Sequence, residues 1–219
     1  MLTVRGLAKS WPGGAPLFEA VSLDLAPGEL VAILGESGAG KSTLLNIVAG
    51  LDRADAGTVT VSGTVVSDLD DDERALWRRG AVGFVFQSFH LLPYLTVEEN
   101  VGLPLLLNGV AAAERRARSR AALEAVGMAA TATRKPSSLS GGEMQRAAVA
   151  RAVVHRPSLV LADEPTGNLD EVNAAATMKA LRDAVKREGA AGLLVTHSTV
   201  AAGCADRVLR LAGRHLGPA

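Results

Sequence analysis

A run of eight residues has the types and spacing needed to hold a chain of phosphates. The segment Gly35-Glu-Ser-Gly-Ala-Gly-Lys41-Ser42 fits the pattern G-x-x-x-x-G-K-[ST]. Its glycines let backbone N–H groups turn inward around a β-phosphate, and a helix that starts behind them adds a favourable dipole. Lys41 can then reach the β- and γ-phosphates, and the Ser42 hydroxyl can ligate Mg²⁺. The residues predicted to contact the nucleotide here are Gly35, Glu36, Ser37, Gly38, Ala39, Gly40, Lys41, Ser42 and Thr43.

The stretches on either side of this loop support the same interpretation. Leu30–Leu34 is a short apolar run of the kind shown by a buried parallel strand, and residues 42–50 predict a helix with one apolar face. Gly50 stands where that helix would be capped at its C-terminus. A glycine-rich turn that arose by chance would not need a buried strand before it and a helix after it. We therefore interpret the segment as a phosphate-binding loop between a strand and a helix.

Length and composition narrow the class of protein. The chain has 219 residues, enough for one large domain or one domain with an inserted subdomain. Lys plus Arg and Asp plus Glu both number 23, so no overall charge draws the protein to nucleic acid or to an acidic membrane. The single Cys204 cannot form an internal disulfide, and we interpret it as a small buried hydrophobe. No run approaches the ~18 apolar residues that span a bilayer, so work at a membrane would go through a partner, without direct membrane insertion.

The N-terminal stretch predicts strands and one aromatic contact. Residues 2–9 and 17–25 alternate in polarity and are separated by a turn-rich loop with Trp11 at its edge. A nucleobase stacks well on an indole ring, so we expect Trp11 to stack on adenine; the alternative is that it fills an edge of the core. Residues 57–66 predict a hairpin, because polarity alternates around a Ser-Gly turn.

Two charged stretches have ordinary explanations. The acidic residues from Asp68 to Glu73 could suggest a metal site, but they lack a Ca²⁺-loop pattern. They also come directly before residues 74–79, which belong to a surface helix in our interpretation. We interpret them as the negative first turn of a surface helix. Residues 111–126 predict a helix rich in alanine and arginine. Glu114 and Glu124 accompany its arginines, so we expect a solvated helix face and no nucleic-acid site.

Polar residues follow three further apolar runs at the points where strands would end. Residues 81–86 lead to Gln87, residues 159–162 to Asp163 and Glu164, and residues 192–196 to His197. Residues 207–211 predict a weaker last strand. Ligands of open parallel α/β sheets bind at the carboxyl ends of the strands, so we expect these side chains at the same edge as the phosphate loop.

A second helix start carries glycines that need an explanation. Ser140 and Glu143 have the spacing of a capping box, so a helix should begin there and run through Val154. Gly141 and Gly142 fall in its first turn, where glycine is costly. Close approach of the backbone to a ligand would account for them. The sequence therefore predicts a second anion site at a capped helix N-terminus.

These motifs together resemble the ATP-binding-cassette (ABC) ATPases. Leu139-Ser-Gly-Gly-Glu-Met-Gln-Arg146 resembles their signature motif, and Leu159-Val-Leu-Ala-Asp-Glu164 resembles their Walker B motif. Gln87, Asn168-Leu169-Asp170 and His197 fall where such cassettes carry the Q-loop, the D-loop and the switch histidine. The resemblance covers essentially the whole chain, and the stretches 86–101 and 162–170 look like the bacterial lipoprotein-release and macrolide-export branch. Two positions depart from the pattern: Trp11 replaces the usual Tyr, and Ser198 replaces the usual Asp.

The resemblance implies a fold and a set of roles. The fold is an α/β P-loop NTPase (RecA-like) core with an antiparallel β subdomain, from residues 1–87 and 155–219, and an inserted α-helical subdomain at residues 88–154. Glu164 is implied as the general base, with Lys41, Gln87 and His197 as the other catalytic residues. The implied Mg²⁺ ligands are Ser42, Gln87 and Asp163. Ser140, Gly141 and Gly142 are implied to meet ATP held by the opposite subunit of an ATP-dependent homodimer, although a heterodimer with another cassette stays open. Asp170 of the D-loop is also implied to contact the nucleotide.

The resulting functional hypothesis is the ATPase subunit of a bacterial ABC transporter, cytoplasmic and peripheral on the inner face of the membrane. Its permease would dock near Gln87–Asn100, a loop rich in apolar residues; ordinary packing of the helical subdomain is the alternative for that loop. One alternative function is an ABC ATPase that drives signalling without cargo. A nucleic-acid-associated ABC ATPase is less favoured, because the chain has no long coiled coil, second cassette or basic patch. The substrate is not encoded here.

Overall fold

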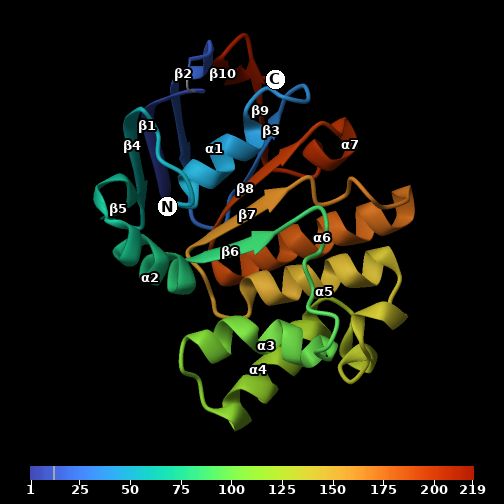
Figure 1. Cartoon of the computed structure of the whole chain (residues 1–219). Helices are drawn as coiled ribbons and strands as arrows, with labels where there is room; N and C mark the ends of the chain where they lie inside the picture. The colour runs from blue at the N-terminus through green and yellow to red at the C-terminus, as the bar shows by residue number, and fades with distance from the viewer. Residues whose placement is uncertain (12) are drawn as a thin grey trace.

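Two β-sheets built from different parts of the chain form the scaffold (Figure 1). The computed structural model describes residues 1–11 and 13–219. Within these residues the larger sheet has the strand order β10-β9-β3-β8-β7-β6, and the smaller sheet the order β2-β1-β4-β5. Strands β9, β3, β8, β7 and β6 run parallel, so their carboxyl ends lie at one edge of the larger sheet. The smaller sheet is antiparallel, which confirms the expected α/β core with an antiparallel β subdomain.

The strands mostly match the expected segments. They are β1 (Leu2–Ser10), β2 (Pro16–Leu25), β3 (Leu30–Leu34), β4 (Ala56–Val61), β5 (Thr64–Val65), β6 (Val82–Val85), β7 (Leu159–Asp163), β8 (Ala191–Thr196), β9 (Arg207–Ala212) and β10 (His215–Pro218). The expected hairpin at residues 57–66 is β4 and β5. Strand β10 was not expected, because Gly217 and Pro218 interrupt its pattern; it pairs antiparallel with β9 at the sheet edge, where proline is tolerated.

The helices lie between and beside these strands. They are α1 (Lys41–Val48), α2 (Asp71–Ala81), α3 (Val97–Leu107), α4 (Ala112–Ala125), α5 (Gly141–Val153), α6 (Glu171–Glu188) and α7 (Thr199–Ala202), with short 3₁₀ turns at Val66–Asp68, Ala129–Thr131 and Pro136–Ser138. Helix α2 confirms that the acidic cluster is a helix start: the Asp70 side chain accepts from the backbone of Glu73, which reciprocates. Cys204 is half-buried just after α7, not buried as expected, because it packs only at the edge of the buried core cluster.

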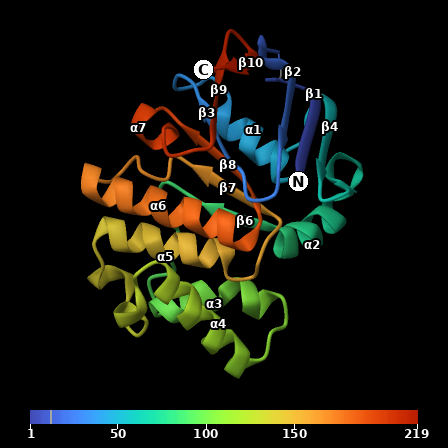
Figure 2. The same cartoon turned by 180° about the vertical axis from the view of Figure 1, so that it is seen from behind.

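Strand β3 is covered on both faces, as its continuous apolar sequence predicts. All five of its residues are buried. Leu30, Ala32 and Leu34 pack into one hydrophobic cluster, whereas Val31 and Ile33 pack into the other. Figures 1 and 2 show the two layers: α1 and the smaller sheet lie on one side of the larger sheet, and α5 and α6 lie together on the other. The strand that leads into the phosphate loop is thus held between two packed layers.

The helical insertion shares the core of the larger sheet. Val101 of α3 and Leu123 of α4 belong to the same buried cluster as Leu30 and Val85 in the sheet. Helix α5 connects the two parts, since it contacts α3 and α4 on one side and α6 and β6 on the other. A movement of the insertion would therefore be transmitted through α5.

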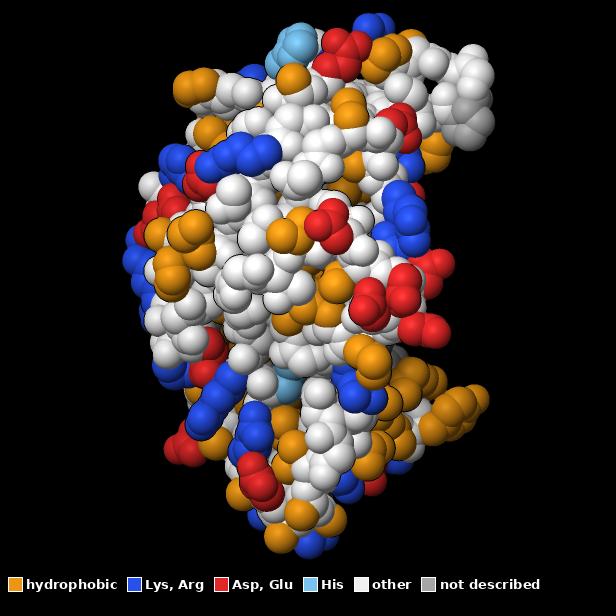
Figure 3. Space-filling model, turned by 90° about the vertical axis from the view of Figure 1, so that its left-hand side faces the viewer, with side chains coloured by type: hydrophobic (Ala, Val, Ile, Leu, Met, Phe, Trp, Pro, Cys, Tyr) orange, Lys and Arg blue, Asp and Glu red, His pale blue; other side chains and the backbone are white. Residues whose placement is uncertain are grey.

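The outer surface has mixed charges. Figure 3 shows Lys and Arg side chains interspersed with Asp and Glu on the face that it presents. In the described part of the chain, no helix has the length and apolar character needed to cross a bilayer.

Candidate active site

The phosphate loop is curled around the side chain of Lys41. The Lys41 Nζ donates to the carbonyl oxygens of Gly35 at 2.8 Å and Glu36 at 2.9 Å, and the side chain is buried. Gly40, with φ 92°, precedes α1 in the left-handed conformation that favours glycine. A Cβ there would lie 2.7 Å from Leu17 Cγ, so the loop also needs glycine for its close packing on β2. The ammonium is held inside the loop that faces the predicted phosphates.

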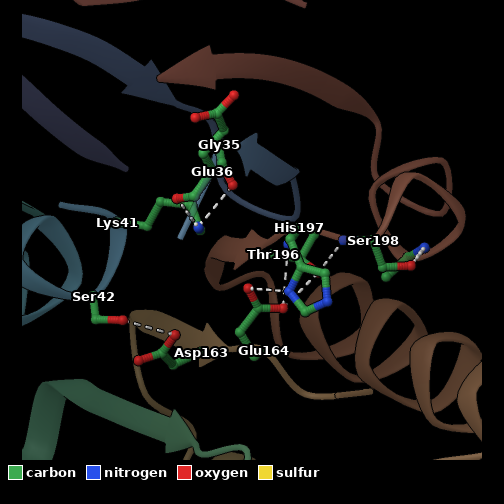
Figure 4. Close-up of polar contacts among 10 residues, drawn as sticks. Gly35, Glu36, Lys41, Ser42, Asp163, Glu164, Thr196, His197 and Ser198 are labelled. Carbon is green, nitrogen blue, oxygen red and sulfur yellow. Dashed lines mark hydrogen bonds and ion pairs between the residues drawn. The ribbon is translucent and has the colours of Figure 1, made fainter. Parts of the chain in front are cut away.

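Two acidic residues leave the end of β7 in different directions (Figure 4). The Asp163 Oδ1 accepts from the Ser42 hydroxyl at 3.2 Å, which joins β7 to the start of α1. Glu164 turns away because its backbone is left-handed, with φ 46°. Its carboxylate accepts from Thr196 Oγ1 at 2.9 Å and from the His197 N–H at 3.2 Å. The ends of β7 and β8 are therefore linked through Glu164.

The His197 ring completes this arrangement. Its Nδ1 lies 2.9 Å from Glu164 Oε1, and its side chain is 67% exposed, so the ring reaches the surface of the cavity while one nitrogen stays with the carboxylate. Ser198, the departure from the family pattern, caps α7 through a bond from the Ala201 N–H. The Ser198 N–H also donates to Thr196 Oγ1 at 3.0 Å, so serine supports the segment that carries His197.

The Asp163 carboxyl suits a site that receives a cation. Its burial raises its pKa above the usual value; the hydrogen bond from Ser42 lowers the pKa, the neighbouring Glu164 raises it and Lys41 lowers it. Mg²⁺ prefers oxygen ligands and in phosphate sites uses one or two protein groups together with phosphate oxygens and water. Ser42 and Asp163 fit that description, although among the described residues no group of three or more His, Cys, Asp or Glu forms a metal cluster of its own.

A cavity of about 520 Å³ connects these groups. It is lined by Trp11, Leu17, Ser37, Gly38, Gly40, Lys41, Ser42, Thr43, Gln87, Asp163, Glu164 and His197. Most of the predicted site residues are therefore brought together, and Trp11 among them is 56% exposed. Leu17 was missed, because nothing in the alternation of β2 distinguishes it from a core residue.

Seven predicted contact residues do not line this cavity. Gly35, Glu36 and Ala39 belong to the loop but face away, and the first two use their carbonyls to hold Lys41. The other four are Ser140, Gly141, Gly142 and Asp170. The capping box at Ser140 is confirmed, with its N–H 2.8 Å from Glu143 Oε2. The start of α5 therefore presents its free N–H groups outside the cavity of its own chain.

Two polar residues of α5 hold the loop after β6, and sequence reasoning missed both. The buried Gln145 donates from Nε2 to the Phe86 carbonyl at 3.0 Å. Arg151 donates to the carbonyls of Phe89 and His90, two residues with left-handed backbones, and burial lowers the Arg151 pKa. A polar residue on an otherwise apolar helix face is the signal that could have identified Gln145. Both bonds tie the position of Gln87 to the helix that carries the signature motif.

The parallel sheet, the phosphate loop at its edge and the acidic residues at the end of β7 define a nucleoside triphosphatase of the phosphate-loop class. The family profile described as "ABC transporter" matches residues 18–167. The chain belongs to this family, and it is an ATP-binding cassette that hydrolyses ATP.

Named relatives and solved structures resemble the whole chain. The lipoprotein-releasing system ATP-binding protein LolD of Maricaulis maris is 48% identical over 94% of this chain and 90% of its own length. The protein of the same name from Pseudomonas syringae pv. tomato is 46% identical over 99% and 96%. The ATP-binding cassette MJ0796, solved as a dimer bound to ADP and Pi, superposes with a TM-score of 0.87 at 37% identity, covering 99% of this chain and 96% of that one.

Proposed function

We propose that this chain is the ATP-hydrolysing subunit of a bacterial transporter that closes as a dimer on ATP and drives a membrane permease. The permease would export or release a lipoprotein, a peptide or a macrolide-like compound. The observation that carries the proposal is the start of α5, a capped and glycine-rich helix N-terminus that contributes nothing to the cavity of its own chain. The names of the LolD relatives and the dimeric state of MJ0796 support it.

The chemistry follows from the groups around the cavity. Glu164 polarises the attacking water, and its bonds to Thr196 and His197 keep the carboxylate oriented before ATP arrives. The His197 ring positions that water beside the γ-phosphate. Lys41 spreads the negative charge of the transferring phosphoryl group, which is the larger part of catalysis in this reaction class. When bound, Mg²⁺ supplies further positive charge at the phosphate oxygens, and Ser42, Asp163 and Gln87 would hold it.

The dimer forms because each ATP site needs the phosphate loop of one chain and the signature motif of the other. The phosphate loop of one subunit binds ATP, and the Ser140 hydroxyl with the backbone of Gly141 and Gly142 in the other subunit meets the γ-phosphate. Asp170 lies in the adjoining D-loop, at the start of α6. ATP then holds the two subunits together through its γ-phosphate. Hydrolysis removes these contacts, so the dimer opens.

The permease docks beside the loop Gln87–Asn100. Tyr94 is 88% exposed and Leu92 48% exposed, yet the loop is anchored. The buried Asn100 accepts from the Leu92 N–H at 2.7 Å and donates to the Leu92 carbonyl at 3.0 Å. Next to it lies a largely apolar cleft of about 570 Å³, formed by α2, β6, α3 and α5. A short helix of the permease, apolar on one face, suits this cleft and would contact Phe86, the residue directly before Gln87.

The test is the Glu164→Gln variant. It should bind ATP, lose about 10² to 10⁴-fold in kcat and elute as a dimer in size exclusion with Mg-ATP. Glu124→Gln is the control, because Glu124 is an exposed glutamate of α4 that lies outside the phosphate loop and does not line the cavity; it should hydrolyse ATP normally. A Glu164→Gln protein that stays monomeric and hydrolyses ATP at the normal rate would refute both the role of Glu164 and the role of ATP in the dimer.

The identity of the partner separates this proposal from its alternatives. Purification from membranes with a bound permease supports the transport or signalling function, and cargo release in reconstituted vesicles distinguishes those two. Association with ribosomes in the absence of any membrane partner would instead favour a nucleic-acid ATPase.

A further inference from the structure

One residue outside the recognised motifs holds both oxygens of the D-loop carboxylate. Asp170 caps α6, and its Oδ1 accepts from the Asn173 N–H at 2.9 Å. The Asn173 side chain also donates, from Nδ2 to Asp170 Oδ2 at 2.7 Å. Within the described residues, three other helices start with a capping box, in which the third helical residue is a glutamate that reaches back to the backbone of the cap residue: Glu73, Glu99 and Glu143. Helix α6 has asparagine there, and its amide is used differently.

The same amide packs against the signature motif of its own chain. A Cβ added to Gly142 would lie 2.0 Å from Asn173 Oδ1 and 2.4 Å from its Cγ, so only glycine leaves room for the asparagine. Because Nδ2 faces the Asp170 carboxylate, Oδ1 must face Gly142. The first turn of α5 carries partial positive charge on its free N–H groups, which favours a carbonyl oxygen at this point. The packing of Asn173 thus explains, within one subunit, why glycine is needed at position 142. This explanation is additional to the expected approach of the backbone to a ligand.

We propose that Asn173 is a positioning residue that joins Asp170 of the D-loop to Gly142 of the signature motif. This inference rests on the proposed ATP-dependent dimer, in which both segments face the nucleotide of the opposite subunit. Capping of α6 requires only the bond to the Asn173 backbone. The additional side-chain bond and the contact with Gly142 make the two segments move together, so that they reach the opposite nucleotide in one fixed geometry.

The experiment compares variants in the Glu164→Gln background, where ATP should hold the dimer. Asn173→Ala removes the link, and the ATP concentration for half-maximal dimerisation should rise about tenfold, the effect of losing a hydrogen bond to a charged group. Asn173→Glu restores an ordinary capping box and preserves the thermal stability of the monomer, but it should weaken dimerisation at least as much. ADP binding to the monomer should stay the same in both variants, because Asn173 does not line the cavity.

A matched control distinguishes positioning from general destabilisation. Asn108, at the C-terminal end of α3, also makes side-chain hydrogen bonds at a helix terminus, to the carbonyls of Arg79 at 2.9 Å and Pro104 at 2.8 Å, but it lies outside the D-loop and the signature motif. Asn108→Ala should leave the ATP dependence of dimerisation unchanged. The inference is overturned if Asn173→Ala and Asn173→Glu dimerise at the ATP concentration of the parent, or if Asn108→Ala shifts it equally. If the parent Glu164→Gln protein itself does not dimerise, the proposed function fails first.

Discussion

Helices α1 and α5 both begin with glycine-rich backbone, yet their N-termini are capped in opposite ways. Gly40 before α1 has no side-chain cap, and no acidic residue lies in the first turn. Ser140 before α5 has a complete capping box, with Glu143 in the first turn. The N–H groups of α1 are left for a ligand, and Lys41 adds a full positive charge beside them. At α5 the protein itself satisfies part of the N-terminus, and the nearby carboxylate opposes an anion.

The difference indicates an order of events. Helix α1 with its loop is an anion site that works in a single subunit, whereas α5 is a weaker site that can only complete an enclosure already begun. ATP should therefore bind to the phosphate loop of a monomer first and recruit the signature motif of the other subunit second. Variants at the two helix starts should separate these steps.

The largest effect is expected at the lysine of the phosphate loop. Lys41→Met removes charge-assisted bonds to two phosphates, so the Kd of the monomer for ATP should rise roughly a hundredfold. Ser140→Ala should leave that Kd unchanged and impair only dimerisation. Calorimetry at protein concentrations below dimer formation measures both. Equal losses of monomer binding in the two variants would contradict the division of labour between α1 and α5.

A smaller effect is expected from the two glycines of the signature motif. Gly142→Ala should destabilise the fold by about 1–3 kcal/mol, because the new methyl group overlaps Asn173. Gly141→Ala is its matched partner: the added Cβ would lie 3.3 Å from Leu169 Cδ2, the end of a flexible side chain, so the cost should be under about 1 kcal/mol. Urea unfolding of the monomers gives both values. Similar losses in the two variants would mean that the packing on Asn173 is not specific.

The smallest effect is expected far from both helix starts. Asp206 accepts from the Leu30 N–H at 3.0 Å, and this bond, with Arg182 and Lys186, lowers the pKa of Asp206 to about 2. A depressed carboxylate pKa stabilises the fold above the unfolded value of 3.8, and this contribution is lost as the pH falls towards 2. Because the group is partly exposed, Asp206→Asn should cost only about 1 kcal/mol at pH 7, after allowance for solvent screening.

The difference between Asp206→Asn and the parent should shrink between pH 5 and pH 2, measured by urea unfolding across that range. Nucleotide binding at pH 7 should stay unchanged, since Asp206 lies next to the start of β3, at the opposite end of that strand from the phosphate loop. A constant difference at every pH would show that the ionised form of the Asp206 carboxyl does not stabilise the fold.

Features carried by neighbouring residues could be predicted from the sequence. The strand before the phosphate loop, the capping box at Ser140 and the polar residues at the strand ends are short-range patterns, and each has its expected place. Contacts between distant segments could not be predicted. The packing of Asn173 on Gly142 and the bond from Gln145 to the Phe86 carbonyl depend on how α5 lies between α6 and β6. No local pattern specifies that arrangement.

The exposed indole at the edge of the nucleotide cavity gives the protein an intrinsic optical reporter. The chain has two tryptophans, and only Trp11 lines the cavity; Trp77 is half-buried on α2, where it packs against the buried cluster that contains Val31 and Ile33. Replacement of Trp77 by phenylalanine would leave Trp11 as the sole strong emitter. An adenine ring that stacks on it would quench its fluorescence, so the arrival and departure of nucleotide could be followed in real time without an attached dye.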